Sequence, residues 1–342
     1  MFAESSTRTS NGVHPIMKLK SKIQIIVLLL ALTAIGVSGY FNRSPRLILK
    51  EIAPEKEISK KVAGEEASIE LLSPKVYLSS DELKQADTLL IKINNGLFTD
   101  KISGEFGPIK IDFLKAAALE SWIGIVGIDV KEKPGRHNLI INFPDDHKIE
   151  REINIVERKF PITKLLITEE LKEKGYTPSK IIENITTKEN LLLKEILSIY
   201  TEKPYFNRAF TYPLKKIKDV GAYGNIRKSG NLAVQHLGID LEADIGTPVY
   251  TINDGAVRFS KDLTIYGKTL IIDHGLGIFS LYLHLNEFKV QNGEQVKQGD
   301  IIGFSGNTGY SIAPHLHFSV KVNGASVDPF IFIETIEKEM TK

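Results

Sequence analysis

The chain has 342 residues, of which 42% are hydrophobic and 25% charged, values typical of a folded protein with room for roughly two or three domains. Its formal net charge is +2 and its lysines and arginines are scattered, which argues against a nucleic-acid-binding protein because such proteins carry a basic stripe. There are no cysteines, which excludes disulfides, thiol nucleophiles and cysteine-ligated metal sites. Any metal must therefore be held by histidine, aspartate or glutamate.

The N-terminal region indicates a membrane anchor. Residues 23–42 contain no charged side chain and follow a polar tail, 1–22. At about 1.5 Å per residue, some 20 residues span a hydrocarbon core of roughly 30 Å. Small residues at 36–39 leave a cleaved signal peptide as the alternative. We expect a single-pass cell-membrane protein whose large domains lie on the extracytoplasmic side, in the periplasm or cell wall, because a short N-terminal tail stays behind.

A small β-domain is expected to follow a charged linker at 43–66. Between 67 and 160 the sequence has short alternating apolar runs separated by turn residues, which is typical of a β-sandwich-like domain. The expected strands are 88–93, 101–106, 109–113, 122–130, 137–143 and 149–156. No cluster of chemically useful residues occurs among them, so this accessory domain is predicted to be a spacer or a docking module for an envelope protein.

A connector with one helix, 161–204, leads to the last domain, 205–335. Thr177 followed by Pro178 predicts a capped helix start, and an apolar stripe predicts a helix over about 178–200. Beyond 205, apolar runs at 247–250, 256–259, 268–273 and 278–284 alternate with glycine-containing turns, which predicts an antiparallel, all-β domain. The protein as a whole is expected to be mostly β.

Histidines concentrate in three apolar segments of the last domain: 236–240 (HLGID), 281–284 (LYLH) and 314–318 (PHLHF). Side chains two or four residues apart on a strand share a face. Each segment is therefore predicted to carry a polar row: His236 with Asp240, Tyr282 with His284, and His315 with His317 and Ser319. Burying polar rows without partners is costly, and one shared metal ion would account for all of them.

Two imidazoles and one carboxylate with an open fourth position form a catalytic zinc site. Five residues compete for three places, and their spacing does not choose among them. The same composition suits a non-haem iron site, although there the carboxylate is typically two residues, not four, from the first histidine.

The residues of these segments resemble those of a known family. The segments 236–240, 305–309 (SGNTG) and 315–317 (HLH) look like those of the lysostaphin/LytM-type zinc metallopeptidases, which cut peptidoglycan cross-bridges. The match covers roughly residues 221–330, and further short motifs occur in the same order: 246–249 (GTPV), 254–255 (DG) and 296–300 (VKQGD). The resemblance implies a LytM-type peptidase domain at the C-terminal end.

Carried over position by position, the resemblance assigns a role to each candidate. It makes His236, Asp240 and His317 the ligands of Zn²⁺, and His284 and His315 a catalytic pair that moves the proton and stabilises the tetrahedral oxyanion. Tyr223 precedes the first ligand in a loop where some members place a transition-state donor. His274 matches no catalytic position and is expected to be a turn histidine.

The resulting functional hypothesis is a membrane-anchored zinc endopeptidase that hydrolyses peptide bonds in peptidoglycan stem peptides or cross-bridges during cell-wall remodelling. The alternative is a non-catalytic envelope scaffold that activates a peptidoglycan amidase, against which the intact set of site residues argues. A biotinyl- or lipoyl-type carrier, suggested by 296–304, lacks a lysine at a hairpin tip. The sequence does not reveal which cross-link is cut, because loops such as 221–235 and 259–268 would set specificity, or whether the accessory domain or connector covers the groove.

Overall fold

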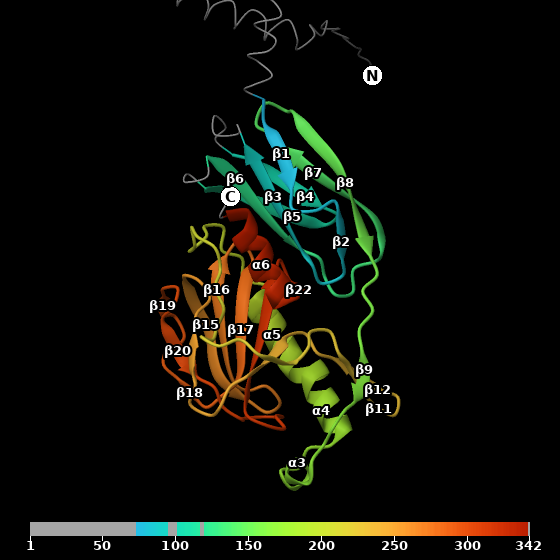
Figure 1. Ribbon diagram of the computed structural model, residues 1–342, viewed down its shortest axis with the longest axis vertical. Helices are drawn as coiled ribbons and strands as arrows, with labels where there is room; N and C mark the ends of the chain where they lie inside the picture. Colours follow the sequence, from blue (N-terminus) through green and yellow to red (C-terminus); the bar gives the residue numbers. More distant parts are fainter. Residues whose placement is uncertain (1–72, 95–100, 117–119, 341–342) are drawn as a thin grey trace, which may run out of the picture. The chain divides into compact units, whose positions relative to one another are not determined.

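The computed structural model describes residues 73–94, 101–116 and 120–340, which all lie in one compact unit, Gly64–Lys342 (Figure 1). The predicted tail, membrane segment and linker, 1–66, lie outside the described residues. Within the described ranges, no helix is long and apolar enough to cross a membrane. The mostly β architecture is confirmed.

The accessory domain is a sandwich built from one eight-stranded sheet that folds over itself, with strand order β1-β3-β6-β5-β4-β7-β8-β2. Its strands are β1 Lys75–Leu78, β2 Glu82–Lys84, β3 Thr88–Asn94, β4 Ser103–Phe106, β5 Ile109–Ala116, β6 Ser121–Gly127, β7 Gly135–Asn142 and β8 Lys148–Val156. The first half of β5 pairs with β4 and its second half with β6, so β5 joins the two layers. Alternate residues of both layers, such as Leu89, Ile91, Leu139 and Ile153, fill one apolar core.

The outer face of β3 and β6 is apolar too, and it packs against the last domain. Leu90, Ile123 and Ile125 belong to the same buried cluster as the core of that domain. A Cβ atom on Gly127 would lie 2.9 Å from atoms of Val322 and Val327, so only glycine allows this close approach. The accessory and C-terminal domains therefore share a core.

The connector contains β9 Ile162–Lys164, α3 Glu169–Glu173, α4 Pro178–Asn184, a π-helical turn Ile185–Glu189 and α5 Asn190–Leu197. The predicted helix start is confirmed, because the Thr177 side chain accepts a hydrogen bond from the Lys180 amide and Pro178 occupies the first turn. The sequence did not indicate the role of Glu189. This buried carboxylate accepts hydrogen bonds from the amides of Ile265 (2.8 Å) and Tyr266 (3.0 Å), which fixes the connector to the last domain.

The last domain is organised around a second eight-stranded sheet, ordered β10-β13-β21-β17-β16-β15-β19, with β22 paired to β21 (Figure 1). Its strands are β10 Asp219–Gly221, β13 Ile239–Glu242, β15 Gly255–Leu263, β16 Gly267–Gly275, β17 Ile278–Leu285, β19 Gln295–Val296, β21 His315–Val322 and β22 Ala325–Val327. A smaller sheet is formed by β14 Pro248–Tyr250, β18 Glu287–Phe288 and β20 Ile301–Phe304. A third contains β11 Ile226–Ser229 between β12 Leu232–Gln235 and the connector strand β9.

One expectation for this domain was wrong: it is not all-β, because the chain forms a helix, α6 Pro329–Met340. Asp328 precedes the helix and accepts a hydrogen bond from the Phe330 amide, and Pro329 occupies the first position. Phe332 and Ile336 bury one side of the helix in the shared core. The start signal was therefore present in the sequence.

One histidine of the last domain, His274, lies in the core. His274 is fully buried, its Nδ1 lies 2.7 Å from the Asp254 carbonyl oxygen and its Nε2 lies 2.8 Å from the Ser280 hydroxyl. It occupies strand β16 and is a core residue, so its expected place in a turn was wrong. Burial lowers the pKa of His274 to about 4.

This pKa predicts a pH-dependent stability. Between pH 4 and the ordinary histidine value of 6.5, the unfolded chain binds a proton that the folded chain excludes, so the free energy of unfolding falls as the pH drops. Relative to His274→Asn, the wild-type protein should lose roughly 2 kcal/mol between pH 7.5 and pH 5. Urea unfolding of both proteins at both pH values measures this. An unchanged difference would contradict the neutral, buried state of His274.

Candidate metal and catalytic site

The site lies where β13 and β21 pair at one side of the large sheet. Their antiparallel register sets Asp240 opposite His317, which places both side chains on the same face. His236 comes from the turn just before β13, and the backbone passes so close to the site that a Cβ on Gly238 would lie 2.4 Å from His317 Nε2. His236 and Asp240 therefore meet through a turn and not, as expected, along one strand.

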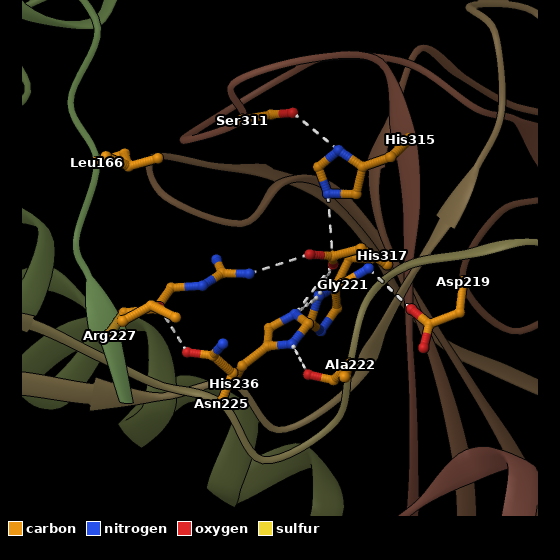
Figure 2. Close-up of polar contacts among 12 residues, drawn as sticks. Leu166, Asp219, Gly221, Ala222, Asn225, Arg227, His236, Ser311, His315 and His317 are labelled. Atoms are coloured by element: carbon orange, nitrogen blue, oxygen red, sulfur yellow. Dashed lines mark hydrogen bonds and ion pairs between the residues drawn. The ribbon is translucent and has the colours of Figure 1, made fainter. Parts of the chain in front are cut away.

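Three ligand atoms converge at this point (Figure 2). His236 Nε2 lies 2.9 Å from Asp240 Oδ1 and 2.9 Å from His317 Nδ1, and His317 Nδ1 lies 2.8 Å from Asp240 Oδ1. All three residues are at most 9% exposed. Among the residues that the structure describes, this is the one cluster of three such side chains able to hold a metal ion.

The remaining hydrogen bonds orient both imidazoles. His236 Nδ1 lies 3.1 Å from the Ala222 carbonyl oxygen, which can only accept, so Nδ1 carries the proton and Nε2 presents its lone pair. His317 Nε2 lies 3.0 Å from the Ser319 hydroxyl, in agreement with the predicted shared face. Two oriented imidazole nitrogens and a carboxylate oxygen are the donors that a zinc ion with an open position requires. The residues therefore fit zinc.

His284 and His315 flank the three ligands. Their ring centroids lie 4.9 Å apart, and that of His284 lies 6.0 Å from that of His317. His284 Nδ1 lies 2.8 Å from the Thr308 carbonyl oxygen and His315 Nδ1 lies 2.7 Å from that of Ala313. Because carbonyl oxygens only accept, both Nδ1 atoms carry protons and both histidines keep Nε2 available for chemistry.

The expected alignment of Tyr282 with His284 was wrong. Tyr282 is fully buried in the apolar core, where its hydroxyl contacts Ser280 and the Ile252 amide. A bulge explains the difference, because β17 advances three residues from Tyr282 to Leu285 while β16 advances two. His284 has a φ of +61°, a left-handed conformation that is unfavourable for histidine by roughly 1–2 kcal/mol and turns its ring to the opposite face.

The connector supports this unusual conformation. The His284 amide donates to the Tyr266 carbonyl oxygen (3.1 Å), and the adjacent Tyr266 amide donates to Glu189. Thr308, whose carbonyl oxygen holds the His284 ring, accepts a hydrogen bond from the Lys268 amide through its hydroxyl (2.9 Å). Sequence reasoning missed these supports because they join segments far apart along the chain.

Burial and mutual contacts shift the pKa values of the site residues in different directions. Burial alone would raise the pKa of Asp240, but hydrogen bonds with His236, His315 and His317 outweigh it and hold that pKa well below its usual range. Burial lowers the pKa of His317 to about 4 and that of His284 to about 3. For His315 the effect of burial is outweighed by Asp240, whose Oδ1 lies 3.5 Å from Nε2, and the pKa is raised.

Of two further side chains near the ligands, one faces away from the site and the other contacts Asp240. Tyr223 is not a donor to it, because its buried hydroxyl donates to the Ser326 carbonyl oxygen at 2.9 Å. Arg227, which the sequence did not single out, places Nη2 3.1 Å from Asp240 Oδ2 (Figure 2).

Comparison with known proteins agrees with this geometry. Residues 234–329 match the model of peptidase family M23. Peptidoglycan DD-endopeptidase ShyA of Vibrio cholerae is 42% identical over 93 residues, which are 27% of this chain and 22% of that relative. Glycyl-glycine endopeptidase ALE-1 of Staphylococcus capitis is 39% identical over 107 residues, 29% of either chain.

A crystal structure of a putative peptidase M23 from Pseudomonas aeruginosa has a similar fold, with a TM-score of 0.52 and 24% identity over 72% of this chain and 93% of its own. Residues 234–329 match a peptidase M23 domain of the LytM type, so the family resemblance predicted from the histidine segments is confirmed. Peptidases of this family are zinc metallopeptidases.

The ligand assignment predicts different effects of two neighbouring substitutions. His317→Ala removes one of three converging donors and should abolish zinc retention, whereas His315→Ala should leave the zinc content near one ion per chain. Elemental analysis of both purified variants measures this. Equal zinc content in the two variants would contradict the assignment.

Proposed function

We propose that this chain is a zinc metalloendopeptidase that hydrolyses peptide bonds in peptidoglycan stem peptides or cross-bridges. The observation that carries the proposal is the convergence of His236, Asp240 and His317 with His284 and His315 directly beside them. Two of the similar proteins are a peptidoglycan DD-endopeptidase and a glycyl-glycine endopeptidase, which supports a peptide bond of the cell wall as the target. A non-catalytic scaffold would not need the flanking pair.

The ligand residues and the flanking pair have separate tasks in this proposal. His236, Asp240 and His317 would hold zinc, which acts as a Lewis acid that acidifies water toward a pKa of about 7 and polarises a carbonyl group. In both His284 and His315 a backbone carbonyl holds Nδ1, which leaves Nε2 as the atom that takes up and releases a proton. One of them accepts the proton of the attacking water, and the resulting imidazolium donates a hydrogen bond to the oxyanion.

The same imidazolium then gives its proton to the departing amine, which returns the pair to its starting state. Such acid–base help contributes about 10²–10⁴-fold to a rate. The left-handed backbone at His284 and the carbonyl of Thr308 keep the ring in place, so little reorganisation precedes proton transfer.

The proposal predicts chelator-sensitive cleavage of peptidoglycan. The purified chain should release peptide fragments from isolated cell walls, and mass spectrometry of the fragments should identify the broken bond. A zinc chelator or His317→Ala should abolish release, and His315→Ala should lower it by about 10²–10⁴-fold while zinc stays bound. Fragment release that continues without zinc, or no release by the zinc-loaded wild-type chain, would contradict the proposed activity.

The proposal also includes anchorage in the cell membrane through 23–42, with the peptidase domain on the extracytoplasmic side. The uncharged stretch and its polar N-terminal tail support it. A reporter enzyme that is active only outside the cytoplasm, fused after residue 66, should be active and should sediment with membranes. An inactive reporter would contradict the proposed orientation. Docking of an envelope protein on the accessory domain stays a prediction from the sequence.

A further inference from the structure

Arg227 extends into the site from strand β11 and makes an ion pair with a ligand residue. Its Nη2 lies 3.1 Å from Asp240 Oδ2, while the other carboxylate oxygen, Oδ1, faces the histidine nitrogens (Figure 2). The Arg227 side chain is 31% exposed and that of Asp240 is 12% exposed, so the guanidinium reaches from solvent to the edge of the ligand cluster. Arg227 lies just before residues 234–329, which match the M23 family model.

Most of the hydrogen-bonding capacity of this guanidinium is unused. A guanidinium has five N–H donors arranged in two forked faces, and among the described residues Arg227 uses a single donor, toward Asp240. One complete forked face therefore stays available. A planar carboxylate fits such a face with two parallel hydrogen bonds.

The charge of Arg227 points to the same kind of ligand. Asp240 already has two close nitrogen partners, because its Oδ1 lies 2.9 Å from His236 Nε2 and 2.8 Å from His317 Nδ1, so Arg227 is not needed to give this carboxylate a polar contact. A permanent positive charge beside a ligand of a divalent cation repels that cation and weakens its binding. An arriving anion removes this conflict, because it neutralises the excess positive charge.

The position of Arg227 is fixed before any ligand arrives. Strand β11 pairs on one side with β12, where Arg227 lies opposite Val234, and on the other side with the connector strand β9, where it lies opposite Thr163. The Thr163 hydroxyl also donates to the side chain of Asn225, the residue just before β11, at 2.7 Å. A preorganised arginine loses little conformational freedom on binding.

We propose that Arg227 binds a free carboxylate of the substrate peptide next to the scissile bond and so selects peptidoglycan with acidic, unamidated peptides. The inference rests on the proposed function and deepens it by naming the substrate class. The carboxylate has two chemical sources: the α-carboxylate of a diamino acid in the cross-link, or the C-terminal carboxylate of a stem peptide. A peptide bond inside an uncharged glycine bridge has neither of these carboxylates beside it.

The test uses three synthetic cross-linked stem peptides that differ only in charge. The first carries both carboxylates free, the second has the diamino-acid carboxylate amidated, and the third has the C-terminal carboxylate amidated. One of the two amidations should lower kcat/KM of the full chain about 10- to 100-fold, the range expected for a charge-assisted pair of hydrogen bonds, and thereby identify the source. Arg227→Gln should erase this preference while the zinc content stays unchanged.

Lys228→Gln is the matched control. Lys228 is the next residue on β11, it is exposed, and alternation turns its side chain to the opposite face of the strand. Lys228→Gln removes one positive charge from the same strand, and it should leave the preference for the free acid over the amidated peptide intact. Arg227→Lys keeps the charge without the fork and should show an intermediate preference.

A binding measurement separates this inference from the proposed activity. Calorimetry with the zinc-loaded His315→Ala chain should show the free acid binding about 10- to 100-fold more tightly than the discriminating amide, and adding Arg227→Gln should remove the difference. Equal affinities, or an Arg227→Gln defect that is the same for all three peptides, would overturn the inference and make Arg227 a positioning residue for Asp240. Preserved acid selectivity in binding without cleavage by the wild-type chain would refute only the proposed activity.

Discussion

The pairing of β13 with β21 is the constraint on which the site depends. It sets Asp240 opposite His317, and a shift by one residue would turn His315 and His317 into the core and expose Leu316 and Phe318. Leu316 and Phe318 are fully buried, so the shift would remove them from the core at a cost of roughly 1.5–3 kcal/mol each. The apolar residues between the ligands therefore hold the ligands in register.

The sequence contained enough information to predict which residues meet, but not how all of them do so. The period of two predicted the shared face of His317 and Ser319, and the hydrogen bond between them agrees. For His284 the same rule failed, because a bulge and a left-handed residue interrupt the alternation at the end of β17. Such an interruption depends on tertiary contacts, and the local sequence pattern does not predict it.

The roles of residues that contact distant parts of the chain could not be predicted from the sequence for the same reason. Glu189 sits in an ordinary apolar stripe of the connector, yet its carboxylate holds amides 76 and 77 residues away. Arg227 lies on the short strand β11, where the sequence shows no distinctive motif, and its significance comes only from the 3.1 Å approach of Nη2 to Asp240 Oδ2. These contacts arise from the pairing of segments that are distant in the sequence. The histidine motifs, in contrast, are short, so their residues can be recognised together in the sequence.

The shared core between the accessory and C-terminal domains limits how freely the two can be separated or exchanged. The outer face of β3 and β6 carries apolar side chains, such as Leu90 and Ile123, where an independent domain would present polar ones. At Gly127 even one added methyl group would collide with Val322 or Val327. A recombination event that supplied an unrelated neighbour would leave this surface uncovered and prone to aggregation, so the two domains are constrained to be inherited as a pair.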